Sequence, residues 1–383
     1  METLLLVLFW SSATLIFHNF FGFWLTLRLI ALFKHDNLAD EGEFLPRLTV
    51  IIPAHNEESI IAEKLDSVLS QGYPSDKLEI IVASDVSTDR TDEIVERYYS
   101  RGVTLISFKE RHGKLGALDE LIPRAAGDVV VVTDANVMHG PESIKKLATV
   151  YADPRVGAAS GYQTVELPNQ STSLREEVIY RSFEANLKKS LGRLGLLVGA
   201  FGGFYSLRRS CFKPIGSKPM EDDIVFPLEA ISQGYKSLFV ADAVGYEEIG
   251  GTMNEEYRRR IRMTAYNLNA LGRAIKLGFK GGVLALYVVI SYKVLRWIAP
   301  LLWVILALTS GLLADRGAIY LSMAVIVISG IGAALIGLIG TINGRRWGIF
   351  SHAWYFAVMN FASLAGFPLW LKGTKSYWTP RGI

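Results

Sequence analysis

Acidic and amide side chains recur where runs of β-branched residues end or where a loop leads into a helix. Asp85 follows one such run, and Asp134 and Asn136 follow the run Asp128–Thr133. Three consecutive acids stand in Met220–Ile224, after a loop broken by glycine and proline. Carboxylate and amide oxygens suit Mg²⁺ or Mn²⁺, and a carboxylate also serves as a general base. The pattern predicts a site that binds a divalent cation bridging a diphosphate.

Each cluster also has a purely structural interpretation. Ser87 or Asp89 can cap the helix expected from Thr91, although neither accounts for Asp85. An Asp-x-Asn pair occurs often by chance, and the acids of Met220–Ile224 would stabilise a helix N-terminus. The functional hypothesis therefore depends on all of these segments occurring together.

An α/β domain over residues 46–250 is the scaffold that the sequence predicts for these residues. Continuous apolar runs predict buried parallel strands, and the stretches between them favour helices, which together indicate a doubly wound sheet. The expected strands are Leu48–Ile52, Leu78–Ala83 and Asp128–Thr133, and the expected helices are Glu57–Gln71, Thr91–Ser100 and Lys114–Ala125. Ligands bind such sheets at the carboxyl ends of the strands, where the polar residues stand.

Apolar segments flank this domain, and half of all residues are hydrophobic. Leu4–Phe33 is expected to be a retained membrane anchor, because it has neither a basic N-terminus nor a small-x-small cleavage site. Val283–Tyr292 is too short to span a bilayer and is expected to lie in the interface. Three segments have membrane length: Trp297–Leu313, Ile319–Ile342 and Gly348–Leu371. The expected division is 1–35, 46–250, 251–296, 297–372 and a tail at 373–383.

Basic residues near the apolar segments predict the orientation. Arg28, Lys34 and His35 place the C-terminal end of the anchor, and hence the α/β domain, in the cytoplasm of a multi-pass plasma-membrane protein. Arg345 and Arg346 predict a cytoplasmic loop. The tail is also basic, and both cannot be cytoplasmic if all three segments span. Gly348–Leu371 is therefore expected to be interfacial or re-entrant.

Charge and cysteine content exclude other classes. The net charge is +3 and no basic stripe interleaved with aromatics exists, so nucleic acid is not an expected partner. The basic cluster Arg258–Arg262 adjoins a membrane segment and favours contact with lipid headgroups. Cys211 is the only cysteine, which excludes an intramolecular disulfide and a cysteine-based metal centre and fits a reducing compartment.

The order and spacing of these segments resemble the inverting family 2 glycosyltransferases of the GT-A fold. The likeness is nearest to the membrane-bound branch that includes cellulose, chitin and hyaluronan synthases, and it covers nearly the whole chain. It implies a UDP-sugar donor, Mg²⁺ or Mn²⁺, and a saccharide or lipid-linked acceptor. It also implies a single displacement that inverts the anomeric centre and gives a β-linkage without a covalent intermediate.

On the donor side, the resemblance assigns a role to each matching position. Asp85 is expected to accept from uracil or ribose, and Ser84 and Val86 stand where the family has Asp and Gly. Asp134 is expected to hold the metal together with Asn136, which replaces the usual second acid. The remaining residues expected near the nucleotide are Pro53, Ala54, Asn56, Glu57 and Lys114.

On the acceptor side, Asp222 matches the general base, and Asp223 is an adjacent competitor. Arg262 matches the arginine that neutralises the leaving diphosphate. Arg259 and Met263 stand where the processive enzymes have Gln and Trp, which argues against long-chain processivity. Trp378, in Tyr-Trp-Thr-Pro-Arg381, resembles a C-terminal Trp-x-x-x-Arg pattern, with one residue fewer before the arginine. The residues expected to form the acceptor floor are Gly199, Phe201, Gly202, Gly203 and Glu221.

Other functions remain open at this point. The acceptor is either a growing polysaccharide or a membrane lipid or polyprenyl carrier that receives one sugar, and three or so spans are few for a secretion channel. A transporter or scaffold has no use for acids at three strand ends, and the spans lack the charges of a translocation path. A nucleotidyltransferase would need a glycine-rich basic loop after the first strand, where this chain has His55, Asn56 and Glu57.

Overall fold

The computed structural model describes residues 1–33, 44–165, 172–216, 218–247, 253–343, 345 and 347–373. The chain divides into two compact units. A helical unit comprises Met1–Thr26, Gly251–Leu271 and Ile290–Thr374. An α/β unit comprises Leu27–Gly250 and Gly272–Val289, and it carries every candidate site residue of the α/β domain.

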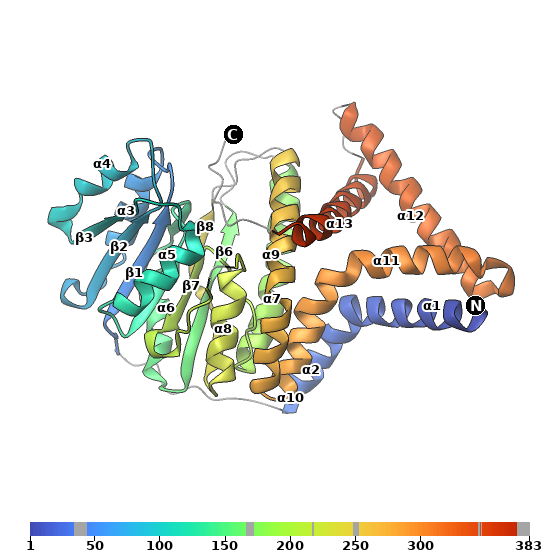
Figure 1. Ribbon diagram of the computed structural model, residues 1–383, viewed down its shortest axis with the longest axis horizontal. Helices are drawn as coiled ribbons and strands as arrows, with labels where there is room; N and C mark the ends of the chain where they lie inside the picture. The colour runs from blue at the N-terminus through green and yellow to red at the C-terminus, as the bar shows by residue number, and fades with distance from the viewer. Residues whose placement is uncertain are drawn as a thin grey trace. The chain divides into compact units, whose positions relative to one another are not determined.

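One mixed sheet forms the centre of the α/β unit (Figure 1). Its order is β3-β2-β1-β4-β7-β6-β8-β5, and β1 to β4 run parallel while β7 is antiparallel to both of its neighbours. The strands are β1 Leu48–Ala54, β2 Leu78–Ser84, β3 Val103–Ser107, β4 Val129–Thr133, β5 Val137–His139, β6 Val156–Val165, β7 Phe204–Arg208 and β8 Lys236–Glu247. The predicted α/β fold with a doubly wound first half is confirmed.

Buried alternate residues of the central strands fix the sheet between helices. Val50 and Ile52 of β1 share one core with Val129 and Val131 of β4, and three helices close that face. Those helices are α3 Ile61–Leu69, α4 Thr91–Glu96 and α6 Ser143–Thr149. The other helices of the unit include α5 Gly113–Leu121, α7 Thr172–Arg193 and α8 Asp222–Ser232, and α5 packs on β1. β1 is buried along its whole length and Thr49 is its one polar residue, so the other polar residues of this segment follow the strand end.

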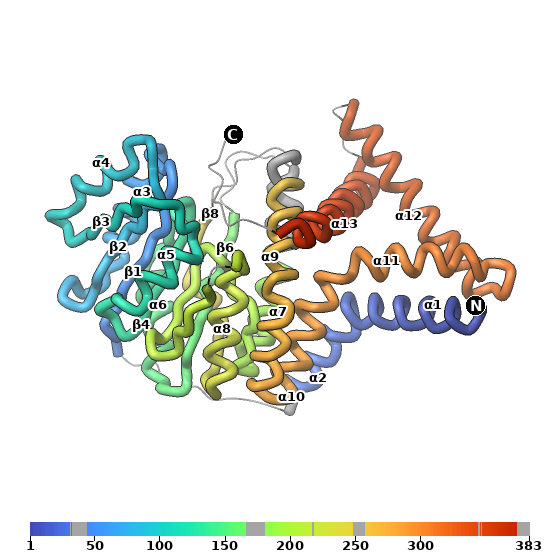
Figure 2. Tube along the Cα trace, in the orientation of Figure 1, coloured from blue at the N-terminus to red at the C-terminus, as the bar shows by residue number. Residues whose placement is uncertain are grey.

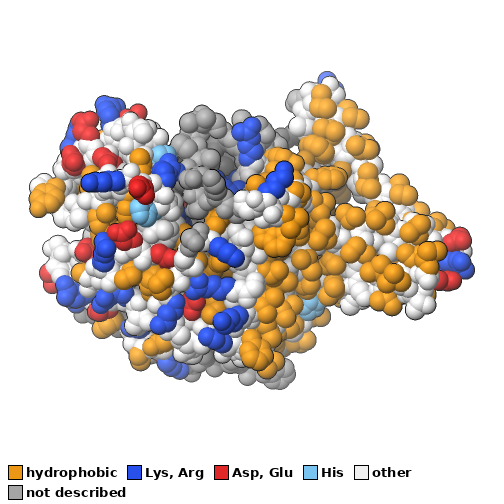
Figure 3. Space-filling view, in the orientation of Figure 1, with side chains coloured by type: hydrophobic (Ala, Val, Ile, Leu, Met, Phe, Trp, Pro, Cys, Tyr) orange, Lys and Arg blue, Asp and Glu red, His pale blue; other side chains and the backbone are white. Residues whose placement is uncertain are grey.

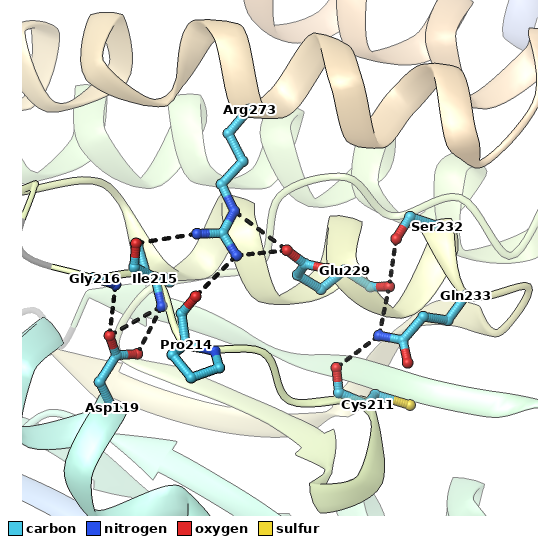
Figure 4. A network of polar contacts seen from close by, with 9 residues as sticks. All are labelled: Asp119, Cys211, Pro214, Ile215, Gly216, Glu229, Ser232, Gln233 and Arg273. Atoms are coloured by element: carbon cyan, nitrogen blue, oxygen red, sulfur yellow. Dashed lines mark hydrogen bonds and ion pairs between the residues drawn. The ribbon is translucent and has the colours of Figure 1, made fainter.

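The last turns of α9 (Met253–Lys280) belong to the α/β unit and are held there by one arginine. Arg273 Nη2 lies 2.6 Å from Glu229 Oε1 of α8, and the same guanidinium donates to the carbonyls of Pro214 and Ile215. Asp119 of α5 accepts from the backbone N–H of Ile215, and Figure 4 shows the loop held between the two side chains. The loop that leads toward α8 is therefore fixed from two sides.

Within the described residues, four helical runs are long and apolar enough to cross a membrane. They are Glu2–Ile30, Val283–Leu312, Ala318–Ile342 and Ile349–Leu371. The expectation that Val283–Tyr292 stands alone as a short segment is wrong. The π-helical turn Val289–Val294 joins α10 (Val283–Val288) to α11 (Leu295–Leu312) without a break, as the tube in Figure 2 shows. The physical reason is that no glycine or proline interrupts the backbone between the two helices.

Within the helical unit, apolar side chains both pack the helices and cover them. Phe9 and Ile16 of α1 (Glu2–Phe17) pack with Leu302 and Leu306 of α11. Helices α12 (Ala318–Ile342) and α13 (Ile349–Leu371) pack against each other. Figure 3 shows hydrophobic side chains over the surface of α12, with few charges among them. Exposed apolar surface of this extent on long helices is typical of contact with lipid.

Candidate active site

The turn after β1 is locked onto the turn after β2. Asn56 Oδ1 accepts from the backbone N–H of Thr88 at 2.7 Å, and the backbone N–H of Glu57 donates to Thr91 Oγ1 at 2.8 Å. Pro53 and Ala54 are the last residues of β1 and are fully paired with β2. These four predicted nucleotide residues therefore lie at one edge of the sheet, at the carboxyl ends of two neighbouring parallel strands.

Val86 adopts the backbone conformation that favours glycine. Its φ is +60°, in the left-handed region, where a β-branched side chain is an outlier. The family pattern has glycine at this position, so the turn keeps its shape although the residue differs. The geometry of the Asp85 turn is thus retained at a cost in backbone strain.

Asp85 lies behind this turn and holds the start of α5. Its side chain is only 1% exposed, and its two oxygens accept from the backbone N–H groups of His112 at 2.7 Å and Gly113 at 3.0 Å. Arg111 Nε lies 3.2 Å from the same carboxylate. A direct contact between Asp85 and a nucleotide stays a prediction, and the contacts present are those of a residue that positions α5.

Arg111 also lies against His55, the residue after β1. Its Nη1 is 3.0 Å from His55 Nδ1. Burial and the neighbouring guanidinium lower the pKa of His55 below its usual value, so the ring stays neutral at neutral pH.

Lys114 lies on the first turn of α5. It contacts both the acid predicted for the donor side and the acid predicted for the acceptor side. Its Nζ lies 2.9 Å from Asp134 Oδ1 and 3.3 Å from Asp222 Oδ2, and it donates to the carbonyl of Gly202 at 2.7 Å. Burial alone would lower the pKa of Lys114, but the two carboxylates raise it above its usual value. The ammonium is therefore charged across the physiological range and links three predicted segments.

Asp222 is the buried member of the acidic pair at the start of α8. It is 6% exposed, and its carboxylate accepts a short hydrogen bond from the hydroxyl of Tyr205. Burial, and then the negative charge of Asp222, raise the pKa of Tyr205 well above its usual value, so this hydroxyl remains a donor. Asp223 is less buried and lies beside Gly202. The two acids therefore have different surroundings.

Asp134 and Asn136 occupy the turn between β4 and β5. The backbone N–H of Asp134 donates to the carbonyl of Gly203 at 3.2 Å. The amide nitrogen of Asn136 donates to Glu247 Oε1 at 3.1 Å, and Gln163 and Arg181 contact the other oxygen of that carboxylate. Asn136 is thus fixed by a carboxylate at the end of β8.

The small-residue segment Gly199–Gly203, which precedes β7, is held in place by a lysine of α7. Lys188 of α7 is buried and donates to the carbonyls of Gly199 and Ala200, and its Nζ lies 4.7 Å from the ring centre of Phe201. A Cβ at Gly203 would come within 2.8 Å of Val137 Cγ2, so only glycine fits there. The segment passes directly between the turn that holds Asp134 and the helix that holds Asp222.

A family model described as glycosyl transferase family 2 matches residues 49–216. Residues 49–216 form a family 2 glycosyltransferase domain. The match includes the turns after β1, β2 and β4 and the small-residue segment, and it ends shortly before α8.

Relatives and solved structures agree with this family 2 domain. The chain is 31% identical over 117 residues to the beta-monoglucosyldiacylglycerol synthase of Synechocystis, covering 30% of this chain and 24% of the relative. It is 23% identical over 280 residues to the poly-beta-1,6-N-acetyl-D-glucosamine synthase of Staphylococcus epidermidis, covering 72% and 65%. The chain thus spans less than two thirds of the length of these relatives.

The fold is that of a solved mannosyltransferase. The mannosyltransferase PcManGT of Pyrobaculum calidifontis, solved with GDP-Man and Mn²⁺, superimposes with a TM-score of 0.72 at 24% identity. The superposition covers 95% of this chain and 99% of that one. The mixed sheet is therefore of the GT-A type, with apolar helices at both ends of the chain.

Two residues named from the sequence are not among the described residues of the α/β unit. Arg262 lies in the part of α9 that belongs to the helical unit, so its role at a leaving group stays a prediction. Trp378 lies outside the described residues. Glu221 is the residue before α8, next to Asp222. All other predicted site residues lie in the α/β unit.

Several residues that contact the predicted site residues were not predicted. Tyr205 follows the small-residue segment on β7, and its place directly after that segment gave the only signal. Glu247 ends β8 and, like Asp85 and Asp134, is an acid at a strand end. Lys188 carried no signal, because a lysine in a helix is usually exposed.

Proposed function

We propose that this chain transfers a sugar from a nucleotide sugar, a UDP-sugar by resemblance, to a lipid-linked or saccharide acceptor with inversion. The observation that supports this most is the placement of Lys114 between Asp134 and Asp222. A donor-side acid and an acceptor-side acid are needed within a few ångströms of one reacting carbon. One partly buried ammonium within 3.3 Å of both meets that requirement.

The reaction proceeds as one displacement. The acceptor hydroxyl oxygen attacks the anomeric carbon while the bond from that carbon to the diphosphate oxygen breaks. Asp222 takes the hydroxyl proton, and Tyr205 and Lys114 hold its carboxylate in place. The nucleoside diphosphate leaves with the bonding electrons, and Arg262 is the residue proposed to neutralise it.

A divalent cation fits this site only together with the donor. Asp134 offers a carboxylate and Asn136 an amide oxygen. Among the residues that the structure describes, no group of three His, Cys, Asp or Glu side chains forms a cage for a metal. When bound, Mg²⁺ or Mn²⁺ would polarise the diphosphate, and such ions commonly take most ligands from phosphate and water.

This arrangement predicts a metal-dependent enzyme whose cation binds weakly alone. Treatment with EDTA should abolish transfer, and added Mg²⁺ or Mn²⁺ should restore it. Calorimetry should detect tight cation binding only with the nucleotide present. Full activity in EDTA would contradict the proposed metal site.

The acceptor is proposed from the relatives and the chain's own segments. One relative is named for a diacylglycerol product and the other for a polysaccharide, and this chain has Met263 in place of the tryptophan of processive enzymes. We therefore favour transfer of one or a few sugars to a lipid-linked acceptor. The family 2 domain is proposed to face the cytoplasm.

Donor turnover by the purified full chain tests the proposal. The protein in detergent is assayed with UDP- and GDP-sugars, with and without lipid extract. Release of the nucleoside diphosphate for one donor, and a β-linked product by NMR of the anomeric proton, are expected. No turnover of any donor, or a retained α-configuration, would refute the proposal.

A further inference from the structure

A lysine is fully buried on the core face of α3. Lys64 is 0% exposed and shares that face with Ile61, Leu65 and Val68, all of which are apolar. Burying an ammonium in an apolar core costs several kcal/mol unless each donor is paired. An apolar side chain would fill the same place at no such cost, so the contacts of Lys64 need an explanation.

The three donors of the ammonium all go to the turn that carries Asp134 and Asn136. Nζ donates to Thr133 Oγ1 at 2.7 Å, to the carbonyl of Val137, and to His139 Nε2, which lies 3.0 Å away. Thr133 and Val137 bracket the two predicted metal ligands directly. Ser67, one turn further along α3, accepts from the backbone N–H of His139 at 2.7 Å.

These contacts also define the charge and the tautomer of the His139 ring. An ammonium has no acceptor, so His139 Nε2 accepts and the ring is neutral with its proton on Nδ1. The ring packs on Phe204 with ring centres 4.4 Å apart. Burial, and then the charge of Lys64, lower the pKa of His139 well below its usual value. Burial also lowers the pKa of Lys64 itself well below its usual value, an effect that the charge of Asp134 opposes, so the turn is held by the three hydrogen bonds of Nζ.

We propose that Lys64 is a positioning residue for the donor site: its buried ammonium holds the turn 133–139 from behind and so sets the affinity for the nucleotide diphosphate and its cation. Lys64 touches neither ligand and acts through Asp134 and Asn136. Removing such an outer partner of a metal ligand typically lowers metal affinity or activity by about 10–100-fold. The inference rests on the proposed function, because it assigns the turn to the donor and its cation.

The test compares Lys64→Met with Gln71→Met in the full chain. Methionine keeps the length of Lys64 and removes its charge. Gln71 is also buried, just past α3, but it contacts Ser67 and Ile144 and not the donor turn. Affinity for UDP and for GDP is measured by calorimetry with MnCl₂, and bound Mn²⁺ by electron paramagnetic resonance. Both are measured well below the melting temperature of each variant.

Lys64→Met should weaken nucleotide and Mn²⁺ binding by about 10–100-fold, while Gln71→Met stays within about 2-fold of the unaltered chain. In turnover, the donor KM should rise more than kcat falls. Affinities within about 2-fold for Lys64→Met would overturn the proposal, even if its melting temperature falls, because the role would then be structural only.

Two milder variants apply if Lys64→Met does not fold. Thr133→Val and His139→Phe each remove one acceptor of the ammonium while keeping the side-chain shape, and each should weaken binding by about 3–10-fold. Unchanged affinity in both would overturn the proposal. If the unaltered chain binds neither nucleotide with Mn²⁺, the proposed function itself fails, which this design separates from a failure of Lys64 alone.

Discussion

At the scale of single residues, the proposal depends on which of the two adjacent acids at the start of α8 is the general base. Asp222 is bonded to Tyr205 and Lys114, whereas Asp223 lies beside Gly202. Asp222→Asn keeps the shape and removes the basicity, so transfer should fall about 10²–10⁴-fold, or roughly 3–5 kcal/mol of barrier. Binding of UDP, measured by calorimetry, should survive because the base contacts the acceptor.

Asp223→Asn is the internal control and should be much milder. Activity retained in Asp222→Asn and lost in Asp223→Asn would identify the neighbour as the base. Activity in both would mean that neither acid is the base and that they only favour the N-terminus of α8, whose N-cap is Glu221.

Val86 offers a test of backbone strain in the turn after β2. A residue held at positive φ costs on the order of 1–3 kcal/mol, while glycine adds about 0.5–1 kcal/mol of chain entropy in the unfolded state. Val86→Gly should therefore raise the stability of the α/β unit by about 1 kcal/mol. The change is measured by differential scanning calorimetry of the full chain, because the described residues of the α/β unit contain no tryptophan.

Thr88→Gly is the matched control, because Thr88 lies in the same turn with an ordinary backbone conformation and should lose stability instead. A lower melting temperature for Val86→Gly would show that the left-handed conformation is not strained in solution.

At the scale of elements, the end of α9 is tied to α8 by one side chain. Arg273→Leu leaves Glu229 partly buried without its ion pair and frees two loop carbonyls, which should cost about 2–4 kcal/mol of unfolding free energy. Lys189→Leu, at an exposed position of α7, should change it by less than about 0.5 kcal/mol. Equal melting temperatures for the two variants would show that the contact contributes no stability.

The elements that sequence predicted well are those with a strong local pattern. Strands β1, β2 and β4 are continuous apolar runs, and the structure places all three side by side as expected. No pattern predicted β8, whose burial alternates irregularly and whose pairing with β6 shifts register twice. Long-range pairing of this kind leaves little trace in local hydrophobicity.

The candidate site shows the same difference between local patterns, which were predicted, and long-range contacts, which were not. Asp134 and Asp222 were predicted because each stands at the end of an element. The contacts that Lys64 and Asp85 make in the structure were not predicted. Their partners are 69 and 27 residues away, and the spacing of residues in one segment says nothing about them.

At the scale of the whole molecule, the single cysteine makes the proposed orientation directly testable. Cys211 is buried, and burial raises the pKa of its thiol to about 11, so it should not react with a maleimide at neutral pH. New cysteines can therefore be introduced without removing the native one. The unaltered chain serves as the background control.

Labelling of intact cells with a membrane-impermeant maleimide should distinguish the two sides. If all four helical runs span and the α/β unit faces the cytoplasm, the short turn between α11 and α12 lies outside. Asp315→Cys should then be labelled in intact cells. Tyr99→Cys on the α/β unit and Asn343→Cys after α12 should be labelled only once the membrane is permeabilised. Labelling of Tyr99→Cys in intact cells would place the donor site outside the cell, where nucleotide sugars are not supplied, and would refute the proposed orientation.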